Sequence, residues 1–120
     1  MSTSYCFLLV SDSSGDYWYQ ALRGALVDLG SLQVVSENEM AALLQEQTYD
    51  VVIVDAGAVA NAPEVVSQIR VLAPDTRVVV VTVSPHWKIA KAVFRAGATD
   101  YVYKSLNEEE ILTIFRSLLE

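Results

Sequence analysis

The chain divides into blocks in which apolar residues either run together or recur at helical spacing. The uninterrupted runs are short and rich in valine. Such runs are typical of strands buried on both faces, and recurrence every three or four residues is typical of amphipathic helices. The pattern predicts strands at residues 5–10, 32–35, 50–55, 77–83 and 100–103.

Helices are predicted in the intervals after these strands. The first strand is followed by a polar turn at 11–15 and a helix at 16–29, which we expect to stop at Gly30. Ser36 and Glu39 form a capping box that opens the second helix. The other three helices are expected to begin at Asn61, Ser84 and Asn107, with Ile89, Val93 and Phe94 among the apolar positions of the fourth.

Five strands alternating with five helices predict a single α/β domain over residues 1–120. Crossovers of helical length join parallel strands with right-handed connections. We therefore expect a three-layer sandwich with a five-stranded parallel sheet between two layers of helices.

Composition narrows the classes of function. Fifteen acidic against eight basic residues give a net charge of −7, which disfavours direct binding to nucleic acid. The aliphatic runs are too short to span a bilayer, and the N-terminal residues carry no signal-peptide pattern, so no membrane contact is expected. The single cysteine, Cys6, lies in an apolar run and is expected to be a buried free thiol, which favours a reducing cytoplasm.

Four polar residues are expected at the carboxyl edge of the sheet, where ligands bind in open α/β folds. They are Asp12, Asp55, Thr82 and Lys104, which end or follow the first, third, fourth and fifth strands. Two carboxylates can hold Mg²⁺, an ammonium and a hydroxyl can bind phosphoryl oxygens, and Asp55 can act as a nucleophile. Asp55 taken alone is equally compatible with a helix cap or a solvated strand end. Glycine-rich nucleotide motifs are absent from the sequence.

Four segments carry a resemblance to a known family. They are residues 8–12 (LLVSD), 50–55 (DVVIVD), 78–82 (VVVVT) and 96–104 (AGATDYVYK). Over its whole length the chain resembles response-regulator receiver domains of two-component signalling. The resemblance implies a flavodoxin-like (βα)5 fold with strand order 2-1-3-4-5.

The resemblance also implies roles for site residues. Asp55 would accept a phosphoryl group from a histidine kinase or phosphotransfer protein, so the domain would assist its own phosphorylation without being an enzyme. Asp12, Asp55 and the backbone carbonyl of Gly57 would bind Mg²⁺, and Lys104 would hold the phosphoryl group.

A switch pair and an output surface follow from the same resemblance. Thr82 and Tyr101 would move together when phosphate arrives. The face formed by the fourth helix, fifth strand and fifth helix would then change its affinity for a partner or for a second subunit.

Three positions depart from the family pattern. Ser11 stands where members carry a second acid, so we expect weaker Mg²⁺ binding. Val83 replaces a small residue and is expected to narrow access to Asp55. Ser105 replaces a cis proline; since a cis bond before another residue costs about 3 kcal/mol, we expect a trans or strained bond that re-aims Lys104.

Two other hypotheses remain open, the first because of these departures. One is a degenerate receiver that binds a partner without phosphorylation. The other is a small flavodoxin-like enzyme or ligand-binding domain, which the missing glycine-rich loop disfavours.

Overall fold

The computed structural model describes residues 4–12 and 16–120, and its strands and helices alternate as predicted. The strands are β1 (Tyr5–Val10), β2 (Gly30–Val35), β3 (Val51–Asp55), β4 (Arg77–Thr82) and β5 (Asp100–Tyr103). The helices are α1 (Tyr17–Leu26), α2 (Glu37–Glu46), α3 (Ala62–Leu72), α4 (Trp87–Ala96) and α5 (Glu108–Leu119). The N-terminal residues 1–3 and the part of the polar turn at 13–15 lie outside the described residues.

The sheet has five parallel strands in the order β2-β1-β3-β4-β5, which confirms the predicted flavodoxin-like topology. The central strand β3 pairs with β1 through Val10↔Val54 and with β4 through Asp55↔Val81. The carboxyl ends of these three strands therefore lie side by side. All five residues of β3 are buried, as its uninterrupted apolar run predicted.

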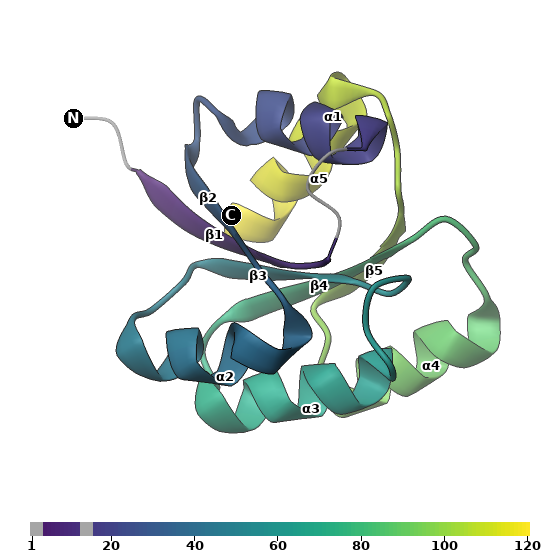
Figure 1. The fold of residues 1–120 in the computed structure, drawn as a ribbon. Coiled ribbons are helices and arrows are strands. Elements are labelled where there is room, and N and C mark those ends of the chain that lie inside the picture. Colours follow the sequence, from purple (N-terminus) through teal and green to yellow (C-terminus); the bar gives the residue numbers. More distant parts are fainter. Residues whose placement is uncertain (1–3, 13–15) are drawn as a thin grey trace.

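Two layers of helices cover the sheet, with α1 and α5 on one face and α2, α3 and α4 on the other (Figure 1). Successive strand residues point to opposite faces, so each strand contributes to both cores. In β1, Phe7 and Leu9 pack with α1 and α5, whereas Leu8 and Val10 pack with the other layer. Burying one such side chain stabilises the fold by about 1.5–3 kcal/mol. Nowhere in the described part of the chain is a helix long and apolar enough to cross a membrane.

Gly30 differs from its predicted role. Helix α1 ends at Leu26, and Gly30 is the first residue of β2 rather than a helix stop. A Cβ atom at Gly30 would lie 1.9 Å from the backbone oxygen of Tyr5. The glycine is therefore required by the close approach of β2 to β1.

Three further predictions made from local pattern are wrong. Cys6 is exposed, because the helix layer that covers Leu8 and Val10 leaves the amino end of β1 uncovered. Ser36 makes no side-chain capping bond; only its backbone oxygen accepts from the Glu39 N–H. In α4 the buried residue is Val93, while the predicted apolar positions Ile89 and Phe94 are exposed.

Candidate functional site

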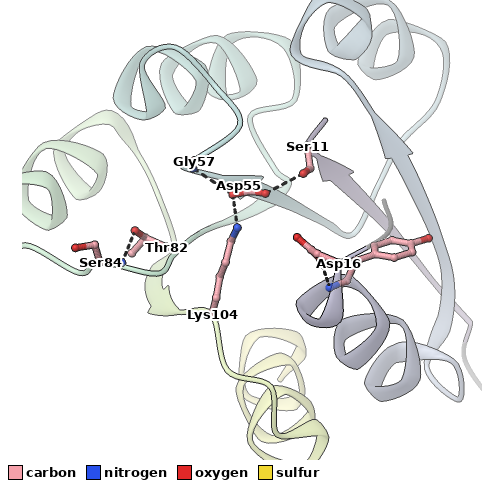
Figure 2. Close-up of polar contacts among 8 residues, drawn as sticks. Ser11, Asp16, Asp55, Gly57, Thr82, Ser84 and Lys104 are labelled. Atoms are coloured by element: carbon pink, nitrogen blue, oxygen red, sulfur yellow. Dashed lines mark hydrogen bonds and ion pairs between the residues drawn. The ribbon is translucent and has the colours of Figure 1, made fainter. Parts of the chain in front are cut away.

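Asp55 ends the central strand, where its carboxylate is almost fully buried, with 2% of the residue exposed. Three donors surround it (Figure 2). Oδ1 lies 2.7 Å from the Lys104 Nζ and accepts the backbone N–H of Gly57 at 3.1 Å. Oδ2 accepts the Ser11 hydroxyl at 2.8 Å. A buried carboxylate is costly unless paired, and these contacts supply both a counter-charge and hydrogen bonds.

Lys104 reaches this carboxylate from the loop that follows β5. Each described peptide bond is trans, including Lys104–Ser105, yet the side chain still points at Asp55. The expectation that Ser105 re-aims Lys104 is therefore wrong. The Ser105 hydroxyl instead stabilises the loop, since it donates to Glu110 at 2.6 Å and accepts from the Asn107 N–H at 3.0 Å.

Ser11 has a role that the sequence did not indicate. The family pattern makes Ser11 the loss of an acid, but in the structure it is a hydrogen-bond donor to Asp55, with 3% of the residue exposed. Val10 pairs with Val54 in the sheet, so the residues following both reach the same edge. That register is the signal that could have identified the contact.

The residues at this edge fit a magnesium ion by their chemistry. Asp12 is exposed and directly follows Ser11, whose hydroxyl contacts Asp55. Carboxylate and carbonyl oxygens with several waters are the ligands that Mg²⁺ prefers. Within residues 4–12 and 16–120, no group of three or more His, Cys, Asp or Glu side chains could hold a metal. The oxygen atoms at this edge are hard donors, and such a set suits Mg²⁺ with retained waters.

Thr82 and Tyr101 line one cavity of about 380 Å³ together with Ala56, which directly follows Asp55. The Thr82 hydroxyl accepts the Ser84 N–H at 3.1 Å (Figure 2). The Tyr101 hydroxyl accepts the His86 N–H at 3.2 Å, and its half-buried ring packs against the core of the α2–α4 layer. The two side chains therefore share a space into which either could move.

Trp18 is buried, as predicted, with 6% of the residue exposed. Its ring also lies under the Lys104 ammonium, with Nζ 4.7 Å from the ring centroid. The helical spacing from Trp18 to Leu22 predicted core packing and gave no indication of this contact. Its place in the first turn of the helix that follows β1, near the carboxyl edge, is the signal that could have suggested it.

Comparisons with known proteins point to one family. The model of the response regulator receiver domain family matches residues 18–116. The alginate biosynthesis transcriptional regulatory protein AlgB of Pseudomonas aeruginosa is 36% identical over 107 residues, which cover 87% of this chain and 23% of that protein. This chain therefore spans about a quarter of the length of that relative.

Solved structures share the fold. An orphan response regulator from H. pylori superimposes with a TM-score of 0.85 at 23% identity, covering 100% of both chains. A response regulator from Burkholderia pseudomallei, with a phosphorylated aspartic acid, a calcium ion and citrate, has a TM-score of 0.74 at 22% identity, covering 89% of this chain and 64% of that one.

Proposed function

This chain belongs to the response regulator receiver domain family, and on that premise we propose that it is a phosphoacceptor in two-component signalling. The acceptor is Asp55, and the donor is a phosphohistidine on a histidine kinase or phosphotransfer protein. We further propose that residues 1–120 form one receiver domain in the cytoplasm, a location that the free thiol of Cys6 supports. The observation that carries the proposal is the Lys104 ammonium 2.7 Å from the buried Asp55 carboxylate.

The transfer step uses the groups around Asp55. A carboxylate oxygen attacks phosphorus, a new P–O bond forms, and the P–N bond to histidine breaks. The imidazole nitrogen leaves with the electron pair of that bond. Lys104 binds a phosphoryl oxygen and offsets its charge, while the Gly57 N–H and Ser11 hydroxyl keep the carboxylate oriented.

Magnesium is the cofactor that we assign to this step. Asp12, Asp55 and the Gly57 carbonyl would hold it, and the ion would supply positive charge to the phosphoryl oxygens. Support comes from the hard-oxygen donor set and from the calcium ion and phosphorylated aspartic acid in the Burkholderia pseudomallei protein. Replacing an acid by Ser11 leaves the two side-chain carboxylates to balance the ion, so we retain the expectation of weaker binding.

Phosphorylation would shift a two-state equilibrium by adding charge beside Thr82. We assign Thr82 and Tyr101 as the switch pair because they line the same cavity. The output would be a changed affinity of the α4–β5–α5 face for a partner or a second copy of the chain. The acidic net charge supports a protein partner rather than nucleic acid.

A degenerate receiver is the second hypothesis, and the geometry disfavours it. Ser105 leaves Lys104 in contact with Asp55, and Ser11 adds a hydrogen bond to the acceptor. The match to the receiver domain family over residues 18–116 disfavours a flavodoxin-like enzyme.

Acetyl phosphate with Mg²⁺ tests the proposal. The expected result is an intact mass increased by one phosphoryl group in the wild type and an unchanged mass in Asp55→Asn. This substitution keeps the shape of the side chain and removes the nucleophilic charge. No adduct at millimolar Mg²⁺, or an equal adduct on the variant, would overturn the proposal and favour the degenerate receiver.

A further inference from the structure

Trp18 is held in a defined position in the first turn of α1. The helix is capped by Asp16, whose Oδ1 accepts the Tyr19 N–H at 2.8 Å. The Trp18 side chain packs in the core between the sheet, α1 and α5. Because the helix start and the core both fix the indole, its position does not depend on Lys104.

Lys104 lies between this indole and Asp55. Its Nζ is 2.7 Å from the Asp55 Oδ1 and 4.7 Å from the Trp18 ring centroid, with 11% of the side chain exposed. A cation over an indole is attracted by the electron-rich ring face, and the attraction is stronger when water is largely excluded. The ammonium therefore has two partners: Asp55, which reacts in the proposed function, and Trp18, which stays in place.

The two contacts differ in how they respond to movement. When a phosphoryl group joins Asp55, the ammonium must move from the carboxylate oxygen to a phosphoryl oxygen. A hydrogen bond loses strength steeply as its angle changes, whereas the attraction to a ring persists to about 6 Å from the centroid. The contact with Trp18 can thus persist while Lys104 changes partner.

We propose that Trp18 is a positioning residue that holds the Lys104 ammonium in place for phosphoryl binding at Asp55. The inference rests on the proposed function and adds a residue to it. Trp18 touches neither the phosphoryl group nor the metal; it acts through Lys104. A purely structural Trp18 would fill the core and leave the affinity of Lys104 for phosphoryl oxygens unchanged.

Two variants separate these roles. Trp18→Phe keeps an aromatic face under Lys104, and Trp18→Leu keeps an apolar side chain in the core without one. The matched control is Trp87→Leu, because Trp87 is the other tryptophan, is exposed, and has Lys88 Nζ 5.6 Å from its ring centroid. The control removes a similar contact away from Asp55.

Beryllofluoride, an analogue of the phosphoryl group, is titrated into each variant at saturating Mg²⁺, and Mg²⁺ is titrated separately, both followed by NMR. We expect Trp18→Leu to weaken beryllofluoride binding by about three- to tenfold, with Mg²⁺ affinity within about twofold of wild type. Trp18→Phe recovers most of the loss, and Trp87→Leu matches wild type. Unchanged beryllofluoride affinity in Trp18→Leu, or an equal loss of Mg²⁺ affinity, overturns the inference.

A double-mutant cycle tests the contact between Trp18 and Lys104 by a measurement that does not require phosphoryl binding. Trp18→Leu, Lys104→Met and the double variant are unfolded in urea without beryllofluoride. We expect coupling between the two sites of at least about threefold in the unfolding equilibrium constant. If wild type binds no beryllofluoride, the proposed function fails, while the contact of Trp18 with Lys104 stands on the cycle alone. Independent effects of the two substitutions overturn the positioning role.

Discussion

Replacing Ser11 by Asp tests whether the hydrogen bond to Asp55 controls Mg²⁺ binding at the proposed site. In the wild type the Ser11 Oγ donates to the Asp55 Oδ2 at 2.8 Å. A carboxylate at the same position can only accept, so the bond becomes a repulsion between two buried charges. Mg²⁺ would bind both carboxylates and remove that repulsion. The variant should therefore be less stable without Mg²⁺ and should gain more stability from it.

The sizes of the stability loss and of the gain from Mg²⁺ both follow from the short distance between the two carboxylates. Two unit charges about 4 Å apart near a protein surface repel by about 4 kcal/mol at an effective dielectric constant of 20. Lys104, in contact with Asp55, offsets part of this, so we expect Ser11→Asp to lose roughly 1–3 kcal/mol of unfolding free energy without Mg²⁺. A tenfold gain in Mg²⁺ affinity would return about 1.4 kcal/mol at saturation.

Urea unfolding followed by circular dichroism, with and without millimolar Mg²⁺, measures both quantities. The control is Ser31→Asp, which adds the same charge at an exposed position of β2 near the opposite edge of the sheet. The control should respond to Mg²⁺ as wild type does. If Ser11→Asp is as stable as wild type without Mg²⁺ and gains no more from the ion, then Ser11 does not control the charge around Asp55.

Three further substitutions have distinct expected outcomes. Lys104→Met removes the counter-charge of a buried carboxylate and should cost roughly 2–3 kcal/mol in urea unfolding; unchanged stability would contradict the ion pair with Asp55. Val83→Ala should raise the rate of acetyl phosphate labelling severalfold by opening the approach to Asp55. It should leave stability within about 0.5 kcal/mol, because Val83 is 69% exposed; an unchanged rate would show that Val83 does not limit access. Gly30→Ala should cost at least about 2 kcal/mol, because its Cβ would lie 1.9 Å from the Tyr5 oxygen, and wild-type stability in urea would contradict that close approach.

The central part of the fold was predictable because burial on both faces leaves few alternatives. The uninterrupted apolar run of β3 and its neighbours gave the strand positions, and chain connectivity then required parallel pairing. The errors lie where burial is partial. Cys6 and Ile89 are apolar residues that the helix layers leave exposed, and hydrophobicity alone does not show which parts of an element are covered.

Short-range contacts with the backbone were also not predicted from the sequence. Gly30 is compatible both with a helix stop and with a strand residue that lies close to the neighbouring strand. The pairing of β1 with β2 decides in favour of the strand residue. Ser36 and Glu39 have the spacing of a capping box, but the structure lacks the Ser36 side-chain bond that such a box requires.

At the candidate site, strand order predicts which residues lie near one another. The contacts of their side chains depend on packing. Asp55 ends β3 and Lys104 follows β5, and the ends of these strands share one sheet edge, so their approach could be expected from strand order. The Ser11 hydroxyl contacts Asp55, and the Trp18 ring contacts Lys104. Both contacts depend on side-chain rotamers, which the sequence pattern does not specify. Both contacts add to the surroundings of Asp55 in ways that the family pattern alone did not indicate.

Borohydride trapping of the phosphorylated protein tests the central claim most directly. An acyl phosphate on aspartate is an activated carbonyl that hydride reduces to homoserine, whereas a free carboxylate is not reduced. After labelling with acetyl phosphate and Mg²⁺, we expect peptide sequencing by mass spectrometry to find homoserine in place of Asp55 and nowhere else. Homoserine in place of Asp12 or another acid, or none in protein that stays folded and Mg²⁺-bound, would contradict the assignment of Asp55 as the phosphoacceptor.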